Sequence, residues 1–490
     1  MFTLETSHLI SLVIASIFSL FLHFSLSGFF KKLDSYFIFF VLFPFILMVF
    51  TLFIPQDFLQ YGSYALILTG CFLGLRNIPL HSKTIQTKWN TLERKEKWII
   101  AFLAIYLFSF FMNTTIFKDG GSIQDAMVYH LEGPKEWALY LNGAKFNTNN
   151  PITFTTSYYD YFYYFIFLIL KPLFIHLAAL PSTGYEFLSY TTLLNAQIFT
   201  GIIALIYVPL LILRFCADLG KYKYLAVVFI YSLRIITWSW FLPKNDIFPF
   251  FCFLVGIELF RKNYVHVDKN DENFPLFLSA LIVGIGTASK LTNAYILIFS
   301  LLFLCSFYFQ KVNVFIKGIG LIKAISIVAT GLFIGASIFL IRNIIHTGNP
   351  FFPIDKFGFP NIYISAYAHR PEFYYFPVKW AMALQKIKLH IVDQPQLLFI
   401  LISAFMFKIR SLPIFYILMV TYMSKQNGKL FTFRMTTIYL VLALILYILT
   451  VQRINSLPHS KFKKYYNYCF ITILLLFSHF QPEKIIKYPL

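Results

Sequence analysis

Residues 35–54 read SYFIFFVLFPFILMVFTLFI, a run of 20 residues with no charged side chain. An α-helix rises about 1.5 Å per residue, so a helix of this length crosses the ~30 Å hydrocarbon core of a bilayer. Similar apolar runs recur along the rest of the chain. The sequence therefore predicts an all-α integral membrane protein that crosses the bilayer many times.

The composition excludes a soluble globular protein. The chain of 490 residues is 58% hydrophobic and 13% charged, with a mean hydropathy of +0.69. Soluble domains carry about 25% charged residues, so roughly half of the usual charge is present. That is too little polar surface to keep a chain with 61 Phe and 32 Tyr in water.

The formal net charge of +20 does not indicate nucleic-acid binding, because the Lys and Arg residues form no single patch. They lie between the apolar runs, where positive charge sets the orientation of a membrane protein. The five Cys residues lie in or beside apolar runs without the spacing of metal ligands. We interpret them as small packing residues.

The alternation of apolar runs and linkers predicts the topology. Basic linkers belong in the cytoplasm by the positive-inside rule, so the connections between them face outward. Two outward connections are long, 118–191 and 343–392. The basic linkers are 31–32, 81–97, 214–223, 261–269, 311–323, 408–410 and 453–464. We expect about 14 transmembrane helices, at 8–30, 35–54, 61–80, 98–117, 192–214, 224–242, 246–260, 275–289, 293–309, 319–341, 393–409, 411–424, 430–451 and 464–480.

Residues 161–181 are long and apolar enough to cross the bilayer, but we expect that they do not. A crossing here would place the next four basic linkers outside the cytoplasm, against the charge rule. We expect a juxtamembrane or re-entrant helix instead. Because proline removes a helical hydrogen bond, Lys171-Pro172 is expected to interrupt this helix.

The first outer loop contains a helical pattern over 124–141. Asp125, Tyr129, Glu132 and Glu136 lie on one face of it, which predicts an interfacial amphipathic helix with an acidic face. Glu132 and Glu136 are alternatively part of a solvated helix face with no role in a reaction. Asp125, at the start of the helix, is alternatively a charge that stabilises the helix dipole. Asp160, just before the next apolar run, is alternatively a boundary carboxylate.

Five motifs, in order along the chain, resemble one family of membrane enzymes. Residues 125–131 (DAMVYHL), followed by Pro134-Lys135 and Trp137, look like the first outer loop of GT-C glycosyltransferases. These include the protein O-mannosyltransferases and the lipid A aminoarabinose transferase. The other four motifs are PKND at 243–246, GIGTASKLT at 284–292, RN at 342–343 with TGNPFFP at 347–353, and FR at 433–434.

The resemblance covers roughly residues 98–451 and implies the domain organisation. Residues 1–97 would be extra N-terminal transmembrane helices with a basic cytoplasmic loop. Residues 98–451 would be the GT-C-like catalytic core, with juxtamembrane helices in its first outer loop. Residues 452–490 would be a C-terminal transmembrane helix and tail.

The resemblance also implies the reaction. Family enzymes transfer a sugar from a polyprenyl-phosphate-linked donor to an acceptor hydroxyl outside the cytoplasm, usually with inversion. Asp125 matches the acid of the first loop and is expected to be the catalytic base, while Asp160 matches, less firmly, a second acid that positions the acceptor. Cations must stabilise the leaving phosphate. The expected binding residues are Tyr129, His130, Lys135, Lys244, Asp246, Lys290, Arg342, Asn349 and Arg434.

Simpler interpretations of the cations remain. Arg342, Arg434, Lys244 and Lys290 are alternatively snorkelling or anchoring residues at the ends of helices. The outer loops contain no D-x-D motif, and no His pair has metal-ligand spacing, so we expect no metal and no cofactor. Some GT-C enzymes use a divalent ion, so that alternative stays open.

Two other classes of function are compatible with the sequence. One is a transporter or flippase of a lipid-linked sugar, and the other is a glycan polymerase or ligase. Transporters often contain paired halves, which this sequence lacks. We therefore expect a multi-pass enzyme of the cell (inner or plasma) membrane, with its active face outside the cytoplasm. Its partners would be the lipid-linked donor, membrane lipids, and a glycan, lipid or protein acceptor.

Overall fold

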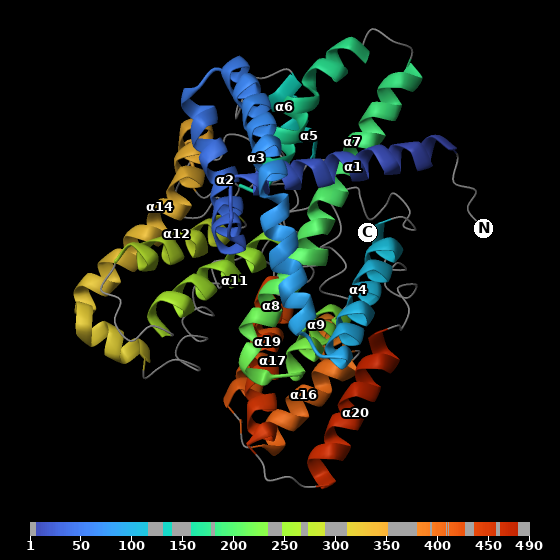
Figure 1. The fold of residues 1–490 in the computed structure, drawn as a ribbon. Helices are drawn as coiled ribbons and strands as arrows, with labels where there is room; N and C mark the ends of the chain where they lie inside the picture. The colour runs from blue at the N-terminus through green and yellow to red at the C-terminus, as the bar shows by residue number, and fades with distance from the viewer. Residues whose placement is uncertain are drawn as a thin grey trace. The chain divides into compact units, whose positions relative to one another are not determined.

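The computed structural model describes an all-helical chain (Figure 1). In the described part of the chain, every regular element is an α-, 3-10 or π-helix, which confirms the predicted all-α class. The described residues are 6–115, 131–139, 158–177, 182–233, 247–265, 273–289, 311–350, 380–392, 394–407, 409, 411–426, 436–456 and 461–478.

The chain divides into two compact units. Unit 1 comprises Met1–Ala101, Phe108–Val208 and Ser239–His369, and unit 2 comprises Phe102–Leu107, Pro209–Trp238 and Arg370–Leu490. The helices up to η4, with α11, η7, α12 and α14, lie wholly or largely in unit 1, and the others lie in unit 2. Their bounds are α1 Thr6–Gly28, α2 Leu33–Phe53, α3 Gln56–Thr91, α4 Arg94–Thr115, α5 Glu132–Leu139, α6 Asp160–Leu177, α7 Ser182–Ile202, η4 Ile203–Tyr207, α8 Val208–Phe215, η5 Ala217–Leu219, α9 Tyr222–Ser232, α11 Phe248–Phe260, η7 Arg261–Val265, α12 Phe274–Ala288, α14 Leu321–Thr347, α15 Trp380–Ile387, η12 Lys388–Val392, α16 Pro395–Met406, α17 Ser411–Gln426, α19 Thr436–Asn455 and α20 Lys461–Ser478.

Several helices have the length and apolarity of membrane spans. Among the described residues, five qualify: Ile10–Gly28, Leu33–Phe53, Gln56–Thr91, Tyr190–Phe215 and Leu321–Ile345. Shorter apolar helices include α12, α16 and Leu440–Asn455. Helices thus occur at most of the ranges expected from the sequence, as in a membrane-embedded protein. The expected span 293–309 lies outside the described residues.

In unit 1, α11 and α12 form an antiparallel pair against which α14 packs (Figure 1). Glycines allow this close approach. A Cβ on Gly256 would lie 2.8 Å from Val283 Cγ2, and one on Gly286 would lie 2.6 Å from Cys252 Cβ. A Cβ on Gly335 of α14 would lie 2.5 Å from the Leu281 carbonyl oxygen. Without a hydrophobic driving force between helices in lipid, such close backbone packing is a main source of association.

Helices α1 and α3 also meet through glycines. A Cβ on Gly70 would lie 2.1 Å from the backbone oxygen of Ser25, and one on Gly28 would overlap the Gly70 carbonyl. The Asn77 side-chain amide donates to the Gly28 carbonyl at 3.0 Å. The last turn of α1 therefore packs in direct backbone contact with the middle of α3.

Polar side chains join α1, α2 and α7 inside unit 1. Asn195 Nδ2 donates to Ser19 Oγ at 2.8 Å, and the Tyr36 and Tyr207 hydroxyls lie 3.0 Å apart. His23 Nδ1 lies 2.9 Å from the Tyr207 hydroxyl, and its Nε2 lies 3.1 Å from the Phe199 carbonyl. Each of these side chains is buried and makes at least one hydrogen bond, which lowers the cost of placing it in an apolar interior.

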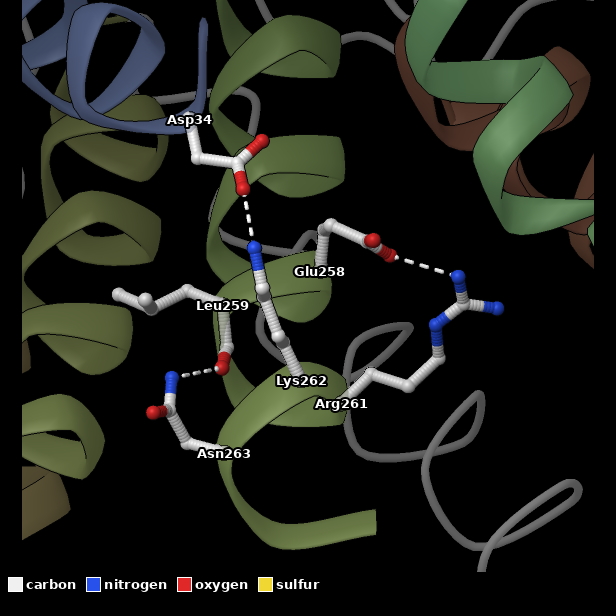
Figure 2. A network of polar contacts seen from close by, with 6 residues as sticks. All are labelled: Asp34, Glu258, Leu259, Arg261, Lys262 and Asn263. Carbon is white, nitrogen blue, oxygen red and sulfur yellow. Dashed lines mark hydrogen bonds and ion pairs between the residues drawn. The ribbon is translucent and has the colours of Figure 1, made fainter. Parts of the chain in front are cut away.

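The beginning of α2 lies beside η7, the π-helical turn that follows α11 (Figure 2). Lys262 forms an ion pair with Asp34, and the neighbouring Arg261 pairs with Glu258 at 3.0 Å. The sequence assigns the basic linkers 31–32 and 261–269 to one side of the membrane. The Asp34–Lys262 contact is consistent with that assignment.

Helix α6 differs from expectation in one respect. It runs unbroken from Asp160 to Leu177 with Pro172 inside it, so the predicted interruption at Lys171-Pro172 is wrong. A proline inside a helix costs about 3 kcal/mol. The side chains of 161–168 are buried almost completely, and burying one large apolar side chain contributes about 1.5–3 kcal/mol. Packing of that segment therefore outweighs the local cost of the proline.

Unit 2 is organised around α9, α16, α19 and α20. Gln396 of α16 donates to the Ser232 carbonyl at 2.8 Å, and the Tyr447 hydroxyl of α19 donates to the Tyr222 carbonyl at 2.7 Å. The ring of Tyr447 stacks on Phe229 with centroids 5.3 Å apart. These contacts fix the ends of α9 against its neighbours.

The α1–α3 contact can be tested with two glycines of the same helix. We expect Gly70→Ala to lower the free energy of unfolding by about 1–3 kcal/mol, because its methyl group would overlap the α1 backbone. Gly62→Ala is the matched control, since nothing lies within 4 Å of its Cβ. Thermal unfolding in detergent micelles measures both. Equal stability of the two variants would contradict the described contact.

Candidate functional site

A fully buried cation marks the end of α14. Arg342 has 0% of its surface exposed and is among the largest fully buried side chains of the described residues. It lies near the C-terminal end of α14, which Gly348 closes in the left-handed conformation with φ 69°. Moving a charge out of water costs several kcal/mol unless other groups compensate. The surroundings of Arg342 must therefore supply that compensation.

An aromatic box from two other helices surrounds the guanidinium. The Arg342 Cζ atom lies 5.3 Å from the centroid of the Trp137 ring of α5. Trp137 in turn packs on Tyr161 and Tyr164 of α6, with centroids 5.5 and 6.5 Å apart. A desolvated cation on a tryptophan face gains about 2 kcal/mol or more. The box therefore offsets part of the cost of burial.

A carboxylate and a phenol also stabilise the Arg342 guanidinium electrostatically, in addition to the contact with the Trp137 ring. Asp160 is completely buried at the start of α6 and interacts electrostatically with Arg342. The Tyr161 phenol also interacts with the guanidinium and lies near Thr51 of α2. A carboxylate in the first turn of a helix is further stabilised by the helix dipole. Asp160 and Tyr161 thus offset a further part of the cost of burying the guanidinium.

Tyr158 attaches the turn before α6 to α14. Its hydroxyl donates to the Gly335 carbonyl at 2.8 Å and accepts from the Phe339 backbone N–H at 3.0 Å. In a regular α-helix the Phe339 N–H would donate directly to the Gly335 carbonyl. Burial raises the pKa of the Tyr158 phenol above its usual value, so the hydroxyl stays protonated and keeps its donor. Tyr158 is thereby attached to α14 about one to two turns before Arg342.

Helix α5 is held from two sides. Gln56, the first residue of α3, donates its side-chain amide to the Ala138 carbonyl, and α5 packs extensively on α6. Trp137 and Ala138 are fully buried, as the apolar face of the predicted amphipathic helix requires. On the polar face, Lys135 pairs with Glu132 at 3.6 Å.

The residues after α14 fold back on its end. Asn343 Nδ2 donates to the Pro350 carbonyl at 3.2 Å, and Asn349 is fully buried. The left-handed conformation of Gly348 favours glycine, which explains that residue in the TGNP segment. The RN and TGNP parts of one predicted motif are therefore a single structural unit beside Arg342.

The structure brings some of the predicted site residues together. Asp160 and Arg342 share the buried cluster, and Asn349 lies at the end of the same helix. Lys135 is on α5, paired with Glu132. The other predicted residues lie outside the described residues: Asp125, Tyr129, His130, Lys244, Asp246, Lys290 and Arg434.

The burial of Arg342 decides between two interpretations of that residue. A snorkelling arginine places its guanidinium in water, whereas this side chain is wholly enclosed. The anchoring interpretation is therefore wrong for Arg342.

Sequence reasoning missed the aromatic partners. Trp137 lies within a quoted motif, but nothing in the pattern assigned it a role. Tyr158 and Tyr161 flank Asp160 in the run SYYDYFYYF at 157–165, where the density of tyrosines was the available signal. Within the described part of the chain, Trp137 Nε1 and the Tyr164 hydroxyl have no hydrogen-bond partner. Buried donors of this kind are rare, because each costs about 1–3 kcal/mol.

No group of three or more potential metal ligands gathers among the described side chains. Comparison with known proteins adds no assignment: no family model matches the chain, and neither a curated protein nor a solved structure is significantly similar to it.

A double-mutant cycle tests the buried pair. We expect Asp160→Asn and Arg342→Gln each to lower the free energy of unfolding by about 3–5 kcal/mol, because each removes the opposite charge that stabilises the other buried group. The double variant should lose less than the sum of both. Unfolding in mixed detergent micelles measures all three.

The exposed pair Asp34–Lys262 provides the matched control, since its side chains are 31% and 60% exposed. The same cycle there, with Asp34→Asn and Lys262→Gln, should give a coupling of only about 0–1 kcal/mol. Strictly additive losses for Asp160 and Arg342 would show that these two groups do not stabilise each other.

Proposed function

We propose that this protein is a membrane glycosyltransferase of the GT-C type. It would transfer a sugar from a polyprenyl-phosphate-linked donor to an acceptor hydroxyl, with inversion. The observation that supports this most is the joint burial of Asp160 and Arg342. Arg342 belongs to one of the five motifs that resemble this family, and Asp160 matches, less firmly, the family's second acid. A chance resemblance would not require these two residues to meet in space.

The proposed roles follow from access to the reacting atoms. Asp125 is the catalytic base, because a base must reach the acceptor hydroxyl within hydrogen-bond distance. Asp160 and Arg342 are enclosed, so we assign them to positioning the first outer loop against α14. Stabilisation of the leaving phosphate needs cations. We assign it to Lys244, Lys290 and Arg434, for which the family resemblance implies this role.

The proposed orientation places this site outside the cytoplasm. The basic end of unit 1 contains Asp34 and Lys262, at the beginning of α2 and in η7. Gln56 follows the opposite end of α2, and it contacts α5. With the basic end in the cytoplasm, the cluster around Arg342 would face the outer leaflet. The protein would then be a multi-pass enzyme of the cell membrane.

A flippase of a lipid-linked sugar is the second candidate, because it would also need cations at the level of the lipid headgroup. Transporter sites usually lie near the bilayer midplane between paired halves. The cluster lies instead where α2 ends and α3 begins. This favours an enzyme that works at the membrane surface.

The activity can be measured in proteoliposomes with a short-chain polyprenyl phosphate that carries a radiolabelled hexose and with an added acceptor that bears a free hydroxyl. The wild type should move the labelled hexose to the acceptor hydroxyl and release free polyprenyl phosphate. We expect Asp125→Asn to lower turnover by about 10²–10⁴-fold, the usual contribution of a general base. Donor binding should persist, because the substitution removes no positive charge.

Asp218→Asn is the matched control, since Asp218 is an exposed aspartate of η5 and should retain full turnover. Movement of intact donor across the membrane without cleavage would favour the flippase. Unchanged turnover in Asp125→Asn would exclude Asp125 as the base.

A further inference from the structure

A groove of about 630 Å³ opens between the end of α1 and the second half of α3, entirely within unit 1. Both of its walls combine apolar and hydrogen-bonding side chains. The α1 wall consists of Phe24, Ser27 and Gly28. The α3 wall consists of Gly74, Ile78, His81, Ser82, Ile85, Gln86 and Trp89.

The length of α3 explains why this groove lies at a membrane surface. The helix has 36 residues, so it extends about 54 Å, well beyond the ~30 Å hydrocarbon core. Its apolar half ends at Arg76. From there, residues 76–97 carry six Lys or Arg against two Glu, a formal net charge of +4. The groove lies where an apolar span becomes a basic segment.

The lining residues form a single face of α3. Ile78, Ile85 and Trp89 are separated by seven and four residues, the spacing that places side chains on the same side of a helix. They are 45%, 67% and 43% exposed, although they are large apolar groups. His81, Ser82 and Gln86 lie between them. An apolar stripe with interleaved hydrogen-bonding groups matches an amphiphilic ligand.

Cations lie around both ends of the groove. Lys97 stands over the Trp89 ring at 5.8 Å. At the other end, Lys31 and Lys32 closely follow Gly28 and are exposed. Asp34, the acid nearest to Lys32 in sequence, pairs with Lys262. Near Lys97, Glu93 and Glu96 are outnumbered by the six Lys or Arg residues of 76–97. The groove is therefore electrostatically favourable to an anion.

We propose that this groove binds an anionic phospholipid, with the acyl chain on the apolar stripe and the phosphate among the polar groups. Phe24, Ile78 and Ile85 would contact the chain. His81, Ser82 and Gln86 offer hydrogen bonds, and the surrounding lysines attract the negative charge. The charge complementarity and the position at the end of a membrane span favour a lipid over a peptide. The groove shares no residue with the proposed catalytic site, so the test of lipid binding is independent of the test of glycosyltransferase activity.

The probe is phosphatidylglycerol, with phosphatidylcholine as the neutral competitor. The full chain is reconstituted in nanodiscs that contain both lipids, extracted in mild detergent, and analysed by native mass spectrometry. The wild type should retain phosphatidylglycerol in preference to phosphatidylcholine. Ile85→Glu should lower that retention by more than about tenfold, because it places a carboxylate in the apolar stripe beside a phosphate.

Leu80→Glu is the matched control. Leu80 is an exposed apolar residue of the same segment, at 48%, and it does not line the groove. Its variant should retain phosphatidylglycerol like the wild type. A second comparison tests charge: Lys97→Gln should lower retention by about fivefold, and Lys95→Gln should have a smaller effect.

Three results would overturn the proposal. The first is equal retention of both lipids by the wild type. The second is equal retention of phosphatidylglycerol by Ile85→Glu and Leu80→Glu. The third is a crosslink from a cysteine at Ser82 to another segment of this chain, which would show that protein fills the groove.

Discussion

One buried guanidinium constrains the whole of unit 1. Arg342 has no exposed surface, so the protein must provide everything that water would have provided. A ring from α5, a carboxylate and a phenol from α6, and the end of α14 are all required at the same place. These elements can move apart only by leaving a charge uncompensated. The positions of α5 and α6 relative to α14 follow from that requirement.

The other contacts of unit 1 support this arrangement without adding charge. Helix backbones approach each other at glycines such as Gly70 and Gly335, where any side chain would overlap a neighbouring carbonyl. The hydroxyl of Tyr158 joins the turn before α6 to two backbone groups of α14. Inside a membrane each of these contacts satisfies a polar group or allows close packing, which are the two sources of helix association there.

The helices could be predicted from sequence because bilayer thickness fixes the length of an apolar run. The expected ranges 8–30 and 35–54 correspond to α1 and α2 within a few residues. Tertiary packing was beyond that reasoning. Pro172 does not break α6, because the preceding turns are tightly packed. The roles of Trp137 and Tyr158 depend on contacts with α14, and no local pattern in the sequence reports contacts between distant segments.

The central proposal is that the buried cluster of α5, α6 and the end of α14 positions its neighbouring segments around a phosphate-bearing lipid. Photocrosslinking of the purified chain with a diazirine-labelled polyprenyl phosphate tests it most directly, with the labelled peptides identified by mass spectrometry. We predict label in the first outer loop and in the segment that follows Asn349, and competition by unlabelled polyprenyl phosphate. Label confined to the basic end around Asp34 and Lys262, or label that unlabelled lipid does not displace, would contradict the account.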